Sequence, residues 1–257
     1  MRARARTATA LLLLLAASRP VFAWPTSLMH RLARDARRLL PNTLNALLAE
    51  REDKVFEAAF RFPPELSRAV ALDLSRGALR PETVTLLQAH LQGFTDAMRE
   101  KRVSDALVQL GASFRVPADL ADPVLSVGDA GYPPGVAREY YAFVEENLGK
   151  IPVVLEDRAA LQLRGADLPR YWQSVLERSR SQSHVIREEL FQKGRLVDHR
   201  ALDFRNPAFA VGSISYSRAV NAIAVTWLAL WRDANGDTTR MPTPIPVKPT
   251  GGDNPRE

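Results

Sequence analysis

The sequence predicts an all-α protein, and three observations support this class. Apolar residues recur at the three- and four-residue spacing of helices along most of the chain. Alternation typical of strands is nearly absent, and residues 151–155 are the single short candidate. The composition, 46% hydrophobic and 25% charged, is that of a globular domain rather than a disordered chain. We therefore expect one domain of packed helices.

The first 23 residues have the pattern of a secretory signal peptide. Three arginines within the first six positions precede an apolar run at 11–17, and Val21 and Ala23 occupy the two small-residue positions of a cleavage signal. The apolar run is too short for a transmembrane helix, which needs about 20 residues. Cleavage after Ala23 would leave Trp24 at the new N-terminus of a periplasmic or extracellular protein.

The charge of the chain changes once this segment is removed. The whole chain has 35 basic and 29 acidic residues, a net charge of +6. The segment contains four arginines and no acidic residue, so cleavage leaves 31 basic residues and a net charge of +2. With only 7% aromatic residues as well, nucleic-acid binding has little support. The absence of cysteine excludes disulfides, thiol nucleophiles and Cys-ligated metals.

Four helices are expected in the first half of the mature chain. Ser27 can cap a helix that Pro41 ends, and Asn42 or Thr43 can cap a second that continues to about residue 59. After the break at residues 63–64, two further helices are predicted over 81–98 and 103–114.

The second half begins with an irregular stretch at 117–135, which is long for a compact domain and indicates a functional loop. Helical spacing returns over 136–148 and is expected over 157–180 and 183–193. The last helix, 213–233, is apolar almost all round, and its run of about 13 apolar residues favours burial over membrane insertion. The domain is expected to cover residues 24–237, followed by a disordered tail at 238–257 that is rich in proline and glycine.

Few side chains suggest chemistry. The sequence has no phosphate-binding or dinucleotide-binding glycine loop, no HExxH motif and no Gly-x-Ser-x-Gly motif. It has four histidines. His90 is expected at the edge of the core, His184 on the surface, and His199, beside Asp198, in a solvated charged loop.

His30 is different because of its position. It follows the predicted N-terminal Trp24 closely, within the segment WPTSLMH. A free α-amino group and its carbonyl oxygen can chelate a divalent ion in a five-membered ring, and an imidazole can add a third bond. The alternative is that His30 caps or packs locally.

Several segments add to this pattern. They are LGASFRVPADLADPVL at 110–125, YPPGVAREYYAFVEEN at 132–147 and RAVNAIAVTWLALWRDANG at 218–236. With Trp24 and His30 they resemble the bacterial zinc-dependent phospholipase C family, which shares its fold with the fungal single-strand-specific nucleases. The resemblance covers the mature chain in order and implies a multi-helix bundle of that type.

The resemblance also implies a zinc centre, of which this chain keeps only a part. Trp24, His30 and Asp119 match the ligands of one zinc, so one zinc ion is the cofactor that the resemblance allows. No carboxylate stands near residues 59–60, where the family has a metal ligand, and no histidine matches the one expected between the second and fourth helices. Four further ligand positions hold other residue types: Arg115, Leu125, Ala137 and Tyr141.

Three hypotheses follow from these substitutions. In the first, the protein is a catalytically degenerate relative with a binding or structural role, and Arg115 pairs with Asp119 four residues later. In the second, it is a diverged phosphoric-ester hydrolase that uses one metal, with Asp119 as ligand or base and Arg115 and Tyr141 facing a phosphate-ester or lipid ligand. In the third, it is a helical binding module unrelated to the family.

Overall fold

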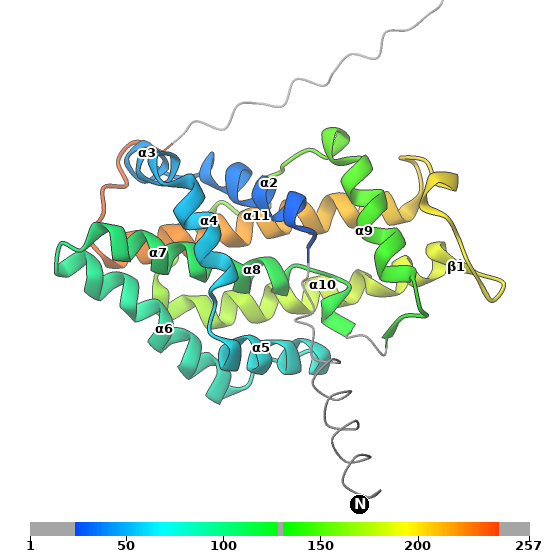
Figure 1. Cartoon of the computed structure of the whole chain (residues 1–257), viewed down its shortest axis with the longest axis horizontal. Helices are drawn as coiled ribbons and strands as arrows, with labels where there is room; N and C mark the ends of the chain where they lie inside the picture. Colours follow the sequence, from blue (N-terminus) through cyan, green and yellow to red (C-terminus); the bar gives the residue numbers. More distant parts are fainter. Residues whose placement is uncertain (1–23, 128–130, 242–257) are drawn as a thin grey trace, which may run out of the picture.

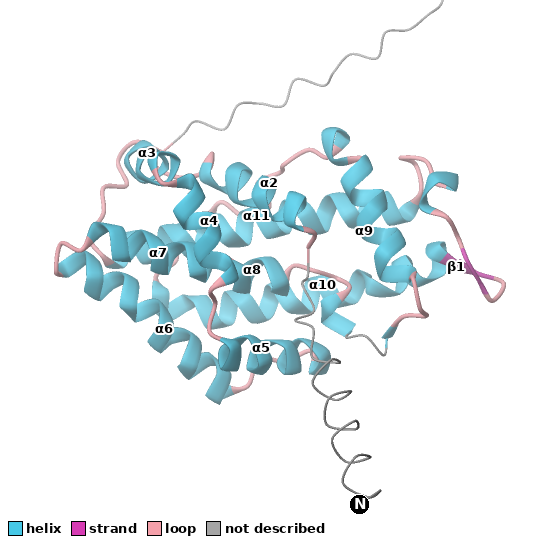
Figure 2. Ribbon diagram, in the orientation of Figure 1, coloured by secondary structure: helices cyan, strands magenta, loops and turns pink. Residues whose placement is uncertain are grey.

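The computed structural model describes residues 24–127 and 131–241 (Figure 1). Helices make up most of these residues, which confirms the all-α class (Figure 2). The predicted signal peptide and most of the predicted tail lie outside the described residues.

The helices up to residue 120 follow one another with short connections, and the later helices with longer ones. Their bounds are α2 (Thr26–Arg37), α3 (Asn42–Glu50), α4 (Glu52–Phe60), α5 (Pro64–Arg76), α6 (Pro81–Arg99), α7 (Val103–Ser113), α8 (Arg115–Leu120), α9 (Val136–Glu146), α10 (Leu168–Leu190) and α11 (Pro207–Asp233). Short 3₁₀ turns link them: η1 (Leu125–Val127), η3 (Leu148–Lys150), η4 (Ala159–Gln162), η5 (Gly165–Asp167) and η6 (His199–Ala201). A hairpin of two antiparallel strands, β1 (Phe191–Gln192) and β2 (Arg195–Leu196), follows α10.

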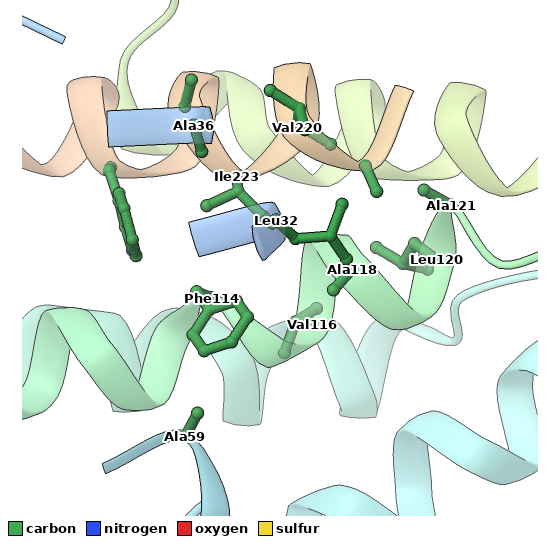
Figure 3. Packing of buried hydrophobic residues seen from close by; sticks show 14 of the residues in the cluster. Leu32, Ala36, Ala59, Phe114, Val116, Ala118, Leu120, Ala121, Val220 and Ile223 are labelled. Carbon is green, nitrogen blue, oxygen red and sulfur yellow. The ribbon is translucent and has the colours of Figure 1, made fainter. Parts of the chain in front are cut away.

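The long helix α11 is the centre of the fold. It runs beside α10 and is covered by α2, α6, α7, α8 and α9 (Figure 1). Every residue from 215 to 231 is buried, as the apolar composition of this segment predicted. In Figure 3, Leu32 of α2 and Ala118 of α8 lie close to Ile223 of α11. Among the described helices, none combines the length and the apolar character that a membrane span requires.

Small residues let some of these helices approach closely. Gly111 of α7 faces α4, and a Cβ at this position would overlap the carbonyl oxygen of Val55. The two helices are among the most closely packed pairs of the described chain. Gly111 therefore sets the distance between α4 and α7.

Several predicted helix limits in the first half were wrong. The first helix ends at Arg37 rather than at Pro41, and the predicted second helix is two helices separated at Arg51. Helix α5 was missed because the prolines at 63–64 were interpreted as a break. Pro64 is instead the first residue of the helix, where its missing N–H has no partner to lose.

The second half differs in similar ways. The helices predicted at 157–180 and 183–193 are one continuous helix, α10, which is preceded by 3₁₀ turns. Helix α11 begins at Pro207, six residues before its predicted start, with the Asn206 side chain accepting a hydrogen bond from the Ala208 N–H. Residues 151–155 form no strand, and the two short strands flank a turn at Lys193 and Gly194, both with positive φ.

Candidate functional site

The segment predicted as an irregular loop begins with a helix. Pro117 has no N–H to donate to the preceding turn, and the chain breaks between α7 and α8 at Phe114. Helix α8 nevertheless continues through Pro117, so Arg115 and Asp119 lie one turn apart. The Arg115 Nε and Asp119 Oδ2 atoms are 3.3 Å apart, which confirms the ion pair expected from their spacing.

Asp119 is held in an environment that disfavours its charge. Both Asp119 and Arg115 are 7% exposed. Burial raises the pKa of Asp119 to about 6, although the Arg115 charge and hydrogen bond act in the opposite direction. Oδ1 of Asp119 is buried and has no hydrogen-bond partner among the described residues.

Asp122, just after α8, is a second buried carboxyl group. Its Oδ1 accepts a hydrogen bond from the Val124 N–H at 2.8 Å, and its Oδ2 accepts one from the Tyr141 hydroxyl at 2.7 Å. Burial raises the pKa of Asp122 to about 7, and the charge of Asp119 adds to this effect. Arg115, Asp119, Asp122 and Tyr141 are called the buried acid cluster below.

Trp24 joins this cluster from the start of α2. Its ring is 1% exposed, and its indole N–H donates to the Ala118 carbonyl oxygen at 3.0 Å. The Trp24 and Tyr141 rings lie 6.0 Å apart between centroids. Three segments that are far apart in sequence therefore meet at one place.

His30 lies in a different environment. Its ring is exposed and stacks on Phe56 with centroids 3.2 Å apart. Partial burial and the charge of Arg34 lower its pKa, while Glu52 opposes them. His30 borders a cavity of about 20 Å³, space for about one water molecule, together with Arg37 of the same helix. These contacts support the alternative in which His30 packs locally.

Two other positions of the zinc-centre pattern hold apolar side chains that serve packing. Leu125 and Ala137 are half-buried against the main core. Tyr141 is protonated at neutral pH, since burial raises its pKa well above its ordinary value and Asp122 adds to the shift. The cluster therefore contains one permanent cation, two carboxyl groups and a neutral phenol, which can hold a proton or an anion more readily than several zinc ions.

The structure corrects one prediction about the histidines and agrees with two. His184 is exposed and His90 is half-buried against Phe62, as expected. His199 was predicted to be solvated, and this was wrong, because it is only 9% exposed and lies against α9. Its Nδ1 lies 2.7 Å from Glu139 Oε2.

The burial of His199 was not predictable from local sequence, because its partner Glu139 is 60 residues away. One local signal was available: Glu139 and Glu146 stand seven residues apart on a predicted helix and so share a face. Both contact His199 in the structure.

Comparison with known proteins identifies no relative of this chain. No family model, curated protein or solved structure matches the chain. Function must therefore be argued from the residues themselves.

Proposed function

We propose that this protein is a secreted, catalytically degenerate relative of the zinc-dependent phospholipases C and single-strand-specific nucleases, with a binding or structural role. One observation carries the proposal. Arg115, Asp119 and Tyr141 stand at positions that the resemblance assigns to metal ligands, and their side chains are engaged instead in an Arg115–Asp119 ion pair and a Tyr141–Asp122 hydrogen bond.

The chemistry of these side chains supports loss of the metal centre. The Arg115 guanidinium is permanently charged and repels a cation beside Asp119. A phenol that keeps its proton, as Tyr141 does, is a poor metal ligand. Leu125 and Ala137 have no lone pair to offer. The residues present therefore do not fit a centre of several zinc ions.

A structural role also agrees with the burial of the cluster. Arg115, Asp119 and Asp122 are all less than 8% exposed, so a substrate could reach them only if neighbouring side chains moved. The ion pair lies within α8, and the hydrogen bond from the Trp24 indole N–H to the Ala118 carbonyl attaches this helix to the start of the domain. Removing one partner of a buried pair typically costs 3–5 kcal/mol, roughly, because it leaves the other charge uncompensated.

The second candidate is a diverged phosphoric-ester hydrolase with one residual metal. The unpartnered Oδ1 of Asp119 favours it, because a buried oxygen without a hydrogen bond can accept a cation or a donor from a ligand. Arg115 would then meet the phosphate of a phosphate-ester or lipid ligand. The stacking of His30 on Phe56 and the nearby positive charge of Arg34 count against it.

Metal content and turnover separate the two candidates. Mature protein beginning at Trp24 is prepared without a tag, since an extension would block the α-amino group. It is assayed with added zinc on phospholipid vesicles and on single-stranded DNA. We expect no zinc-dependent turnover. Turnover that disappears in both His30→Ala and Asp119→Asn, with His184→Ala unaffected, would overturn the proposal and support the hydrolase.

A further inference from the structure

A second group of metal-ligating side chains lies away from the buried acid cluster. The η6 turn after the hairpin rests on α9, and there Glu139, Asp198 and His199 come together. One ligand atom from each lies within 4.8 Å of the others. Glu139 precedes Asp198 by 59 residues and His199 by 60, and Glu139 and His199 are both buried.

The two nitrogens of His199 face different partners. Nδ1 lies 2.7 Å from Glu139 Oε2 and 3.6 Å from Asp198 Oδ1. Nε2 lies 3.0 Å from Glu146 Oε1. In the tautomer that carries its proton on Nε2, the ring donates to Glu146 and directs the Nδ1 lone pair at two carboxylate oxygens. Metal-ligating histidines typically have this arrangement, with the second nitrogen held by a carboxylate.

The neighbouring charges orient Glu139 as well. Arg138 binds the other oxygen, Oε1, with its Nη2 at 2.8 Å and its Nε at 3.1 Å. Oε2 is therefore the oxygen directed at His199. Three carboxylates lie around His199, those of Glu139, Asp198 and Glu146. Among the described residues, the Arg138 guanidinium pairs with one of them, Glu139, so the surroundings are acidic.

The spacing also suits a small divalent ion. Zinc bonds nitrogen and carboxylate oxygen at about 2.0–2.2 Å, so two ligands of a tetrahedral site lie about 3.3 Å apart. His199 Nδ1 lies 2.7 Å from Glu139 Oε2 and 3.6 Å from Asp198 Oδ1, one distance below this value and one above it.

We propose that Glu139 Oε2, Asp198 Oδ1 and His199 Nδ1 form a zinc site that fastens the η6 turn to α9. Glu146 orients the imidazole and Arg138 orients Glu139. Three protein ligands leave a fourth position for water or for an external ligand. The site is separate from Trp24, His30 and Asp119, and it stands whether or not the proposed function is correct.

Zinc binding to tag-free mature protein tests the site by calorimetry and by the thermal unfolding midpoint, with zinc chloride as the probe. We expect one zinc per chain, a rise in the midpoint with zinc concentration, and loss of both in His199→Ala. Asp198→Asn is the sharper variant. Its side chain is 65% exposed, the Glu139–His199 pair remains, and asparagine still accepts a hydrogen bond from the Arg200 N–H. It should leave metal-free stability unchanged and weaken zinc binding by at least about tenfold.

The other histidines provide matched controls. His184→Ala and His30→Ala remove exposed imidazoles elsewhere and should leave zinc binding intact. Three outcomes overturn the site: no binding up to about 1 mM zinc, equal binding in wild type and Asp198→Asn, or binding retained in His199→Ala. The last outcome combined with loss in His30→Ala would place the metal at the other candidate ligands and would support the hydrolase.

Discussion

Replacing Asp122 by asparagine should make the protein more stable at pH 8 and leave its stability nearly unchanged at pH 4. Asparagine keeps the shape of the side chain and its acceptor for the Val124 N–H, and its amide can donate to the Tyr141 oxygen. The substitution therefore removes the buried charge while the hydrogen-bonding positions stay filled.

The size of the effect follows from the pKa of Asp122, which burial raises from 3.8 to about 7. The pKa of Asp122 is higher in the folded than in the unfolded protein. Its contribution to the free energy of unfolding is therefore fully present below pH 3.8 and is lost as the pH rises through about 7. At about 1.4 kcal/mol for each pKa unit, the loss is at most about 4 kcal/mol. Between pH 4 and pH 8, the variant should gain up to this amount relative to wild type.

Urea unfolding followed by tryptophan fluorescence measures this difference, since four tryptophans are present and Trp24, Trp172 and Trp227 are buried. Unfolding curves of wild type and variant are compared at several values between pH 4 and pH 8. Glu57→Gln serves as the control, because it neutralises an exposed carboxylate and should shift stability by less than about 0.5 kcal/mol at every pH. A difference that is independent of pH, or one that favours wild type as the pH rises, would refute the buried-charge explanation.

Three further substitutions test other parts of the structure. Tyr141→Phe removes the hydroxyl that donates to Asp122 and should cost about 1–3 kcal/mol in the free energy of unfolding, measured in urea at pH 7; an unchanged midpoint would contradict the bond. Gly111→Ala places a methyl group against the Val55 carbonyl and should lower the thermal midpoint by separating α4 from α7. A variant with the thermal midpoint of wild type would show that the two helices are farther apart here than the structure has them. Leu228→Ala leaves a cavity at a fully buried position of α11 and should cost about 2–5 kcal/mol, whereas a loss below about 1 kcal/mol would argue against a central position for this helix.

If the buried acid cluster replaces a metal centre, a guanidinium takes the place of the metal ion as the positive charge beside the carboxylates. A metal ion neutralises several carboxylates at once, and a guanidinium neutralises about one. Arg115 pairs with Asp119, and Asp122 is left with hydrogen bonds and a raised pKa. Oδ1 of Asp119 has no hydrogen-bond partner among the described residues, and burial, with a smaller effect from the charge of Asp119, raises the pKa of Asp122.

Features that arise within one or two helical turns were predictable from the amino-acid sequence. The three- and four-residue spacing of apolar side chains predicted the helical class and the burial of α11. The four-residue spacing of Arg115 and Asp119 predicted their ion pair. Helix limits were less certain where proline stood at a boundary, because Pro64 begins a helix and Pro117 lies within one. In both places proline has a suitable φ, and tertiary packing decides the outcome.

Contacts between residues far apart in sequence were not predictable in this way, because they depend on how the helices pack. The tertiary structure brought Tyr141 to Asp122, Trp24 to Ala118 and His199 to Glu139. It left His30 beside Phe56 instead of at the acid cluster. Periodicity shows which side of a helix faces inward, but not which other helix it faces. That choice depends on how α8, α9 and α11 pack together, and the same packing buries the carboxyl groups and raises their pKa values.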